Sequence, residues 1–566
     1  MVKETKHTSN KWRDIAVLLI TLVVVVLVNY LGAFVFDRFD LTSEKRYTLS
    51  ETTTESLETL EDIVFVRVYL EGNLPTEFRE LKDATREMLD ELRAYSDGKL
   101  EFEFINPSAS SDEEERIEFY KTLTAQGLQY SNIRMRTDDK VSEQIIFPGA
   151  IVSYNGGETA VQLLKSQAGA TQQEMIESSV QQLEYEFVSA IRKLSTKEAK
   201  SIAFIQGHGE LDELESADAV ASLKEFYNVE LVTIDEKISA LNGFDAAIIA
   251  RPDTFISEKD KYIIDQFIMN GGKVLWAIDP VNATMDSLRN SNLTMGLAME
   301  HNLTDQLFKY GVRLNSDLVL DLEALPIPIV TGMVGNQPRQ DLFTWYYSPL
   351  LLGNEDHPIT RSIDRMKTEF VSTLDPVELD NVSYTILLES SGQSRLVKAP
   401  TRISFNILRE APQYDLFNSG PHATAVLLEG SFTSVFENRL PKIQANKDLI
   451  FKEKSVPTKM IVLTDGDILK NEINRVEQRY YALGYYKYTD QIYGNKEFLM
   501  NAMNYLLDDS GLVNVRSKDF KIRLLDQAKI DENRYFYQIV NTALPILIVL
   551  LLGGLRIWLR HRKYAQ

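Results

Sequence analysis

Residues 244–280, FDAAIIARPDTFISEKDKYIIDQFIMNGGKVLWAIDP, contain the pattern that decides the fold. Two short apolar runs, Phe244–Ala250 and Lys273–Ile278, flank an amphipathic stretch, Ser257–Asn270, that ends at two glycines. Short apolar runs predict buried strands, and the stretch between them has the spacing of a helix that glycine terminates. Strand, helix and strand in this order predict a parallel sheet with helices on its faces.

The same alternation extends on both sides of this stretch. Upstream, we predict a strand over Ser201–Gln206, a tight loop at Gly207–Glu210, a helix to Phe226 and a strand over Val229–Ile234. Downstream, the pattern predicts two helices, Leu303–Tyr310 and Asn495–Leu507. It also predicts three strands, Thr385–Leu388, Ala425–Leu428 and Lys459–Thr464. Residues 196–510 are therefore expected to form a doubly wound α/β domain with insertions.

Residues 61–195 are expected to form a smaller α/β domain that ends in a connecting helix, Met175–Leu194. Alternating polar and apolar residues predict its strands, and helical spacing predicts its helices, in the order Ile63–Leu70 (strand), 74–95 (helix), Leu100–Ile105 (strand), 112–126 (helix), 133–136 (strand), Gln144–Tyr154 (strand) and Glu158–Leu164 (strand). This order resembles a thioredoxin-like fold, in which a cis-proline precedes a strand as Pro148 does here. The chain has no cysteine, so the fold would serve only as a scaffold.

Two apolar segments predict membrane helices. Residues 15–36 carry no charge, and their 22 residues are enough to cross a bilayer. A signal peptide is the alternative, but no small-residue cleavage site follows. Residues 539–559 form the second predicted span, and basic residues outside both spans place both ends in the cytoplasm. The remaining boundaries are cytoplasmic tails at 1–14 and 560–566, a juxtamembrane collar at 37–60 and a stalk at 511–538.

The charge of the chain excludes several classes of partner. The two ends hold 8 of the 61 basic and 2 of the 82 acidic residues, which leaves a net charge of −27 between them. Such a charge repels nucleic acid and anionic lipid surfaces. The absence of cysteine excludes disulfides and thiolate chemistry, and the six histidines show no metal-ligand spacing. We therefore expect no metal and no cofactor.

Two motifs carry candidate chemistry. His208 and Glu210, in the glycine loop after the first parallel strand, lie where such sheets bind ligands, and His208 has the chemistry of a base. No serine or cysteine nucleophile accompanies them, and a lone histidine in a glycine loop is usually structural. Asp465 and Asp467 suit either a metal site or a turn with a helix cap. No phosphate-binding loop is present, so we do not expect the chain itself to be an ATPase. Because no motif supplies a catalytic set of residues, we expect no other enzymatic activity.

Two further groups of residues are candidate contacts. Trp345, Tyr346 and Tyr347 are candidates to line a ligand pocket, and the alternative is an apolar insertion that packs on a neighbouring part of the protein. Within the predicted membrane helices, the polar Asn29 and the small Gly553 and Gly554 favour packing against partner helices.

The chain as a whole resembles the GldG-type gliding-motility-associated ABC transporter auxiliary proteins. The stretches that carry the resemblance are RFDLTSEKRYTLS (38–50), LEYEF (183–187), GHGE (207–210), DQFIMNGGKVLWAIDP (265–280), NLTDQLFKYGVRLNSDLVLD (302–321) and AVLLEGSFTSVFENR (425–439). The middle domain also resembles the class I glutamine-amidotransferase-like (flavodoxin-like) fold, as seen in an intraflagellar-transport protein. That enzyme family needs a cysteine nucleophile, which this chain lacks.

The resemblance implies a role and partners. A GldG-type protein would be a non-ATPase auxiliary subunit of an ABC transporter in the bacterial inner membrane, linked to gliding motility and to an associated secretion system. Its partners would be a permease and a cytoplasmic ATPase on separate chains, and it would couple their movement to a periplasmic client. The alternatives are a membrane-anchored periplasmic substrate-binding subunit for a sugar, peptide or lipid, and an anchored hydrolase that uses His208 and Glu210.

Overall fold

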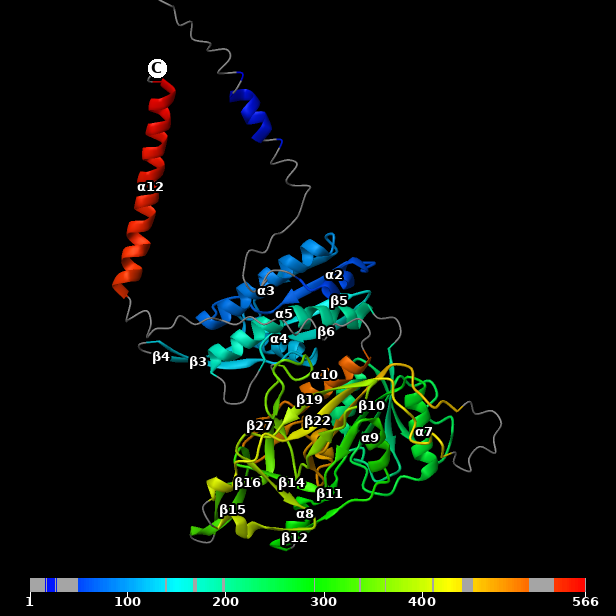
Figure 1. The fold of residues 1–566 in the computed structure, drawn as a ribbon. Coiled ribbons are helices and arrows are strands. Elements are labelled where there is room, and N and C mark those ends of the chain that lie inside the picture. The colour runs from blue at the N-terminus through cyan, green and yellow to red at the C-terminus, as the bar shows by residue number, and fades with distance from the viewer. Residues whose placement is uncertain are drawn as a thin grey trace, which may run out of the picture. The chain divides into compact units, whose positions relative to one another are not determined.

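The computed structural model in Figure 1 has a mixed α/β fold, and its contacts divide the chain into two compact units. One unit is Tyr47–Lys518, and the other joins Met1–Arg46 and Asp519–Gln566. The residues that the structure describes are 16, 18–25, 27, 49–137, 140–165, 171–195, 199–289, 291–334, 337–361, 363–409, 412–439, 451–507 and 534–564.

The N-terminal part of the larger unit is built on a four-stranded sheet in the order β2-β1-β5-β6. Strands β1 and β2 are parallel, and β5 and β6 continue the sheet in antiparallel pairs. Its elements are α2 (Glu51–Glu58), β1 (Val64–Val68), α3 (Thr76–Tyr95), β2 (Leu100–Phe104), α4 (Glu113–Ala125), β3 (Ser131–Thr137), β4 (Lys140–Ile146), β5 (Gly149–Tyr154), β6 (Gly157–Gln162) and α5 (Gln172–Ser195). Apolar side chains from α2, α3 and α5 share one core with this sheet.

The predicted single strand over 144–154 is wrong. The chain breaks at Phe147 and Pro148, so that β4 pairs with β3 while β5 pairs with β1 and β6. Proline has no N–H to donate to a strand ladder, and the Pro148 carbonyl instead accepts the N–H of Leu163. Among the described residues the cis peptide bonds precede Pro400 and Pro421, so the bond before Pro148 is trans.

The C-terminal part of this unit contains five parallel strands in the order β8-β7-β9-β10-β23. They are β7 (Ser201–Gln206), β8 (Asn228–Thr233), β9 (Ala246–Ala250), β10 (Lys273–Ala277) and β23 (Thr458–Leu463). Apolar residues of α6 (Ala217–Lys224) and α10 (Asn495–Leu507) pack in one core cluster with side chains of these strands, and those of α7 (Glu258–Met269) and α9 (Thr304–Tyr310) pack in another. Figure 1 shows α7, α9 and α10 beside the central strands, and the order of the elements confirms the predicted alternation of strands and helices.

Between β10 and β23 the chain makes a long insertion that turns the parallel sheet into a mixed one. Strand β22 (Ala423–Gly430) runs antiparallel to β23, and β19 (Val382–Glu389) and β16 (Gln337–Gly353) continue in antiparallel pairs to the edge strand β15 (Ala324–Val334). The smaller elements are β11 (Val281–Asn282), α8 (Met285–Arg289), β12 (Leu293–Ala298), β13 (Val312–Leu314), β14 (Asp317–Asp321), β17 (Met366–Lys367), β18 (Leu374–Pro376), β20 (Ser394–Lys398), β21 (Thr401–Ser404), η1 (Phe405–Leu408) and η2 (Tyr414–Leu416).

After β23 a short 3-10 helix, η4 (Gly466–Leu469), and two small hairpins lead to α10. The hairpins are β24 (Ile473–Asn474) with β25 (Arg479–Tyr480), and β26 (Tyr485–Tyr486) with β27 (Gln491–Ile492).

The other compact unit contains α12 (Arg534–Tyr564), within which Ile539–Leu559 has 21 residues and a mean hydropathy of 2.1. Among the described residues this is the one helix that is long and apolar enough to cross a membrane, and its side chains are exposed. Of the first predicted span, residues 16, 18–25 and 27 are described, and they are helical and exposed. Asn29 lies outside the described residues, as do positions 37–48 of the collar and 511–533 of the stalk.

Candidate functional site

The loop Gly207–Glu210 leaves β7 at the point where the order of the parallel strands reverses. The chain pairs β7 with β8 on one side and with β9 on the other. Open parallel sheets bind ligands in the crevice beside the carboxyl ends of their strands at such a point. Asp253 packs closely against this loop, because a Cβ atom on Gly209 would lie 1.5 Å from Asp253 Oδ1. The φ of Gly209, +77°, also favours glycine.

His208 is held between two buried carboxylates. Its Nδ1 lies 3.1 Å from Glu210 Oε1, and its Nε2 lies 3.0 Å from Asp260 Oδ2. Asp260 belongs to the first turn of α7, where its other oxygen accepts the Glu236 N–H at 2.8 Å. The hydrogen bond to Glu210 raises the pKa of His208; burial opposes the rise, and the bond to Asp260 adds to it.

This arrangement determines which protons the imidazole carries. Where both carboxyl groups are ionised they only accept hydrogen bonds, and both ring nitrogens of His208 then donate. The ring is then a cation with no lone pair left to accept a proton, and it ties the β7 loop to α7. Sequence reasoning paired His208 with Glu210 but missed Asp260, which is 52 residues further along the chain.

A second cluster of charges lies at the carboxyl ends of β9, β10 and β23. Arg251 follows β9, Asp279 follows β10, and Asp465 and Asp467 follow β23. Arg251 Nη1 lies 2.9 Å from Asp467 Oδ1, and Arg251 Nε lies 3.6 Å from Asp279 Oδ2. Lys470 Nζ lies 3.3 Å from Asp467 Oδ1, so Asp467 contacts two cations.

The carboxyl groups of this cluster titrate differently from one another. Burial, followed by the charge of Asp467, raises the pKa of Asp279 to about 7. The same two causes raise the pKa of Asp465 well above its usual value. Burial also works against ionisation of Asp467, but Lys470 and Arg251 hold its pKa below the usual value. One firmly ionised carboxylate therefore lies between two cations, beside carboxyl groups that retain protons more readily.

Backbone N–H groups bind the oxygens that a metal would need. Asp465 Oδ1 accepts the Asp467 N–H at 2.8 Å and caps η4, and Asp465 Oδ2 accepts the Glu369 N–H at 2.9 Å. Asp279 Oδ1 accepts the Gly466 N–H at 2.6 Å. Asp465 therefore takes the capping role that was the alternative to a metal site. Within the described ranges no group of three acidic or histidine side chains has a metal-binding arrangement.

The predicted aromatic residues lie in the interior of the insertion. Trp345 is fully buried, and Tyr346 and Tyr347 are 7% and 4% exposed. The Trp345 ring centroid lies 5.1 Å from that of Tyr347 and 5.3 Å from that of Phe405. Their contacts in the structure are therefore with the core of the insertion.

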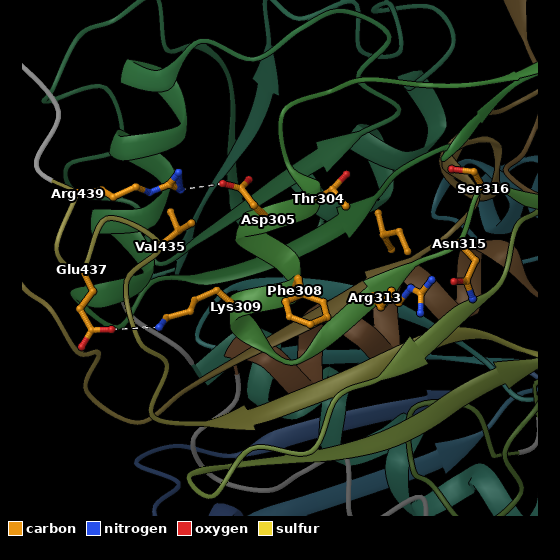
Figure 2. Close-up of a pocket in the computed structure, with 11 residues that line it drawn as sticks. Thr304, Asp305, Phe308, Lys309, Arg313, Asn315, Ser316, Val435, Glu437 and Arg439 are labelled. Atoms are coloured by element: carbon orange, nitrogen blue, oxygen red, sulfur yellow. Dashed lines mark hydrogen bonds and ion pairs between the residues drawn. The ribbon is translucent and has the colours of Figure 1, made fainter.

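A pocket opens beside α9, at a place that sequence reasoning did not single out (Figure 2). Its volume is about 850 Å³, and it is lined by Thr304, Asp305, Phe308, Lys309, Arg313, Leu314, Asn315, Ser316, Val435, Glu437 and Arg439. On one side, Lys309 Nζ lies 3.0 Å from Glu437 Oε2 and Arg439 Nη2 lies 3.0 Å from Asp305 Oδ2. Figure 2 shows Arg313 on the other side of Phe308.

Comparison with known proteins places the chain in a family. Residues 199–502 match the family model described as an ABC-type uncharacterized transport system, and this match covers more than half of the chain. The chain belongs to this ABC transport auxiliary family. Residues 43–153 match a second model, described as a domain of unknown function (DUF7088).

Two individual proteins are similar to this ABC transport auxiliary protein. An uncharacterized protein of Borreliella burgdorferi is 21% identical over 580 residues, which cover 98% of this chain and 99% of the relative. The solved mmIFT52 N-terminal domain matches 54% of this chain and 97% of its own, with 11% identity and a TM-score of 0.31.

The match to the ABC transport auxiliary family includes every candidate site described above. It contains the His208 loop, the charge cluster and the pocket beside α9, and it ends before α12. Gly553 and Gly554 lie on α12, where a Cβ atom added to either would meet no atom within 4 Å. The family and the apolar helix together indicate a transport-associated protein that associates with the membrane.

Proposed function

We propose that this chain is the non-ATPase auxiliary membrane subunit of an ABC transporter complex of the GldG type, linked to gliding motility and to its associated secretion. Its partners are a permease and an ATPase on separate chains, and it couples their movement to a periplasmic client without catalysing a reaction itself. The observation that carries the proposal is the exposed apolar helix Ile539–Leu559 on a chain of the ABC transport auxiliary family.

The proposed topology has two spans, residues 15–36 and 539–559, with both ends in the cytoplasm and residues 37–538 in the periplasm. The basic residues outside the spans and the net charge of −27 between the ends support it. We infer that the sheet β2-β1-β5-β6 is a thioredoxin-like scaffold and that the parallel strands form an amidotransferase-like, flavodoxin-like domain. Without cysteine, neither scaffold has the nucleophile of its enzyme relatives.

The route of the proposed coupling runs through elements that are packed in the cores. On the side of the first anchor, Glu184 Oε1 on α5 accepts the Ser50 N–H and the Thr53 hydroxyl, both at 2.8 Å, at the start of α2. On the side of the second anchor, α10 is the last described core helix before α12, and its Phe498 and Met503 are fully buried.

Helices α5 and α10 are also joined by a hydrogen bond. Asn504 Nδ2 on α10 donates to the Tyr185 hydroxyl on α5 at 3.0 Å. Under this proposal, movement passed to α2 or to α10 would act on both sheets through packed helices. Close-packed elements transmit displacement because they are not compressible.

Co-purification tests the proposed function. A full-length tagged chain is extracted from membranes in mild detergent, and the proteins that remain bound are identified and quantified. We expect a permease and an ATPase in a fixed ratio to this chain, and we expect a chain that ends before Arg534 to lose them. If neither subunit remains bound to the full-length chain, the proposed function is wrong.

A further inference from the structure

Arg313 is an arginine in the pocket beside α9 that forms no ion pair with a described carboxylate. It is exposed on β13, and no described carboxylate lies within 4.0 Å of it. Asp375 pairs with it across the strands, but Asp375 Oδ2 accepts a hydrogen bond from Asn315 at 3.0 Å. In a chain with a net charge of −21, such a guanidinium is suited to bind a carboxylate of a ligand in bidentate fashion.

Phe308 provides an apolar contact in the same pocket. Its side chain is 51% exposed, and the pocket also contains the aliphatic side chains of Leu314 and Val435. The two ion pairs of Lys309 and Arg439 form a charged rim on one side of the ring (Figure 2). An exposed aromatic ring with an arginine nearby and a polar rim is the usual composition of a binding hot spot.

One buried carboxyl group positions two walls of the pocket. Asp265 Oδ1 accepts the Tyr310 hydroxyl at 2.8 Å from α9 and the Val435 N–H at 3.0 Å from the facing loop. Asp265 Oδ2 accepts the Ser434 hydroxyl at 2.7 Å. Because Asp265 is fully buried, these contacts hold α9 and the loop in place before any ligand arrives, which lowers the entropy cost of binding.

The remaining lining fits peptide bonds. Thr304 and Ser316 bring hydroxyl groups, and Asn315 uses its Nδ2 for Thr373 and Asp375, which leaves its Oδ1 as an acceptor. A bare alkyl chain would gain nothing from these groups, whereas backbone amides can bond to them. The volume of about 850 Å³ lies within the usual range for a small ligand, about 300–1,000 Å³.

We propose that this pocket binds the C-terminal end of a polypeptide, with its free carboxylate at Arg313 and an apolar last side chain against Phe308. This inference goes beyond the proposed function, because assembly with transporter subunits through the membrane helices does not use the pocket. The bound segment would be the end of a periplasmic client or of a partner protein, recognised by its terminal carboxylate.

The test is a binding assay on the full-length chain in detergent. A fluorescently labelled peptide, Ala-Ala-Ser-Leu, is compared as the free acid and as the C-terminal amide by fluorescence anisotropy. We expect the acid to bind about tenfold or more tightly than the amide, as loss of a charge-assisted bidentate contact implies. Arg313→Gln should abolish this difference between acid and amide. Phe308→Ser should weaken binding of the peptide acid by about tenfold, and the acid should still bind more tightly than the amide.

Matched controls separate the pocket from general effects. Arg402→Gln replaces another exposed strand arginine, on β21, and Phe255→Ser replaces a phenylalanine that is 63% exposed, so both should bind as the unmodified chain does. The proposal is overturned if acid and amide bind equally, if Arg313→Gln keeps the preference, or if octanoate or glucuronate competes as well as the peptide acid. Arg313→Gln should still co-purify with transporter subunits, so this inference and the proposed function fail independently.

Discussion

At the scale of residues, the carboxyl edge of the parallel strands contains two charges, each placed between two opposite charges. His208 lies between Glu210 and Asp260, which favour its cationic form, and Asp467 is an anion between Arg251 and Lys470. A buried charge that loses its partners leaves an uncompensated charge in a medium of low polarity, which costs several kcal/mol. These side chains therefore hold together loops that follow different strands.

His208→Gln should destabilise the protein in a pH-dependent way. Because the pKa of His208 is raised in the folded chain, its contribution is fully present below its ordinary pKa and is lost as the pH rises through the folded value. We expect a loss of about 3 kcal/mol at pH 6 that shrinks at higher pH. Melting temperatures of variant and unmodified chain between pH 6 and pH 9 measure it.

His357→Gln is the control for this pH dependence. Burial lowers the pKa of His357, so its contribution is lost as the pH falls, and any difference should grow toward alkaline pH. A difference between His208→Gln and the unmodified chain that stays constant over this pH range would show that His208 is not held as a cation.

Asp279→Asn and Asp467→Asn should differ sharply in effect. The pKa of Asp279 is about 7, so its carboxyl is partly protonated at neutral pH, and an amide can still accept the Gly466 N–H. We expect a change below about 1 kcal/mol for Asp279→Asn, and a loss of about 3 kcal/mol or more for Asp467→Asn, which removes the carboxylate nearest to both Arg251 and Lys470. Chemical unfolding of the full chain at pH 7.5 compares them, and equal losses would refute the assignment of charges.

At the scale of elements, α12 has the exposure expected of a helix whose neighbours lie outside the chain. Its apolar residues are exposed along Ile539–Leu559, and within the described part of the chain no atom lies within 4 Å of a Cβ added at Gly553 or Gly554. Paired small residues allow close approach of another helix in a membrane. The helix thus has the length to cross a membrane and, at Gly553 and Gly554, the small residues that the proposed partner contact requires.

Gly553→Leu should leave the fold intact and reduce recovery of the proposed complex. The added side chain meets nothing within this chain, so the melting temperature should not change. A leucine at a close helix contact keeps the partner backbone away, and we expect about a tenfold loss of co-purified permease. Ala543→Leu, elsewhere on α12, is the control for added bulk. If the unmodified chain, Gly553→Leu and Ala543→Leu recover equal amounts of permease, no partner helix contacts Gly553.

At the scale of the whole molecule, polar contacts join α5, which packs on the first sheet, to α10 and to the residues that follow α6. Asn504 on α10 bonds to Tyr185 on α5, and Lys193 on α5 lies 3.7 Å from Glu225 and stacks over Phe226. Such contacts link the two sheets of the larger unit more weakly than a shared core would. They are therefore the natural place to test the proposed coupling.

A double-mutant cycle on Tyr185 and Asn504 measures this link. Tyr185→Phe removes the hydroxyl and Asn504→Leu removes the amide, and we expect a coupling of about 1 kcal/mol between the two substitutions. Calorimetric melting of the four chains provides the energies. In the proposed complex, the double variant should bind permease and ATPase normally but move its client less; additive effects of the two substitutions would remove the basis for this route.

The sequence determined those features that depend on local order along the chain. Apolar runs predicted β7, β8, β9, β10 and β23, helical spacing predicted α7 and α10, and composition marked α12 as a membrane helix, because these signals lie within windows of about 20 residues. Ser50 as the cap of α2 and Gly311 as the end of α9 were predictable for the same reason. The break at Pro148 was missed because a strand pattern does not reveal which neighbour each half will pair with.

Only the tertiary structure decided which distant residues share a site. Asp260 reaches His208, Asp467 reaches Arg251 and Asp265 joins α9 to Val435 across separations of 52, 216 and 170 residues. These contacts depend on strand order and on the packing of helices over the sheet. Neither can be read from a short stretch of sequence. The same physical reason placed Trp345 in a core and left Phe308 exposed beside Arg313: burial is a property of how elements assemble, and residue type alone does not fix it.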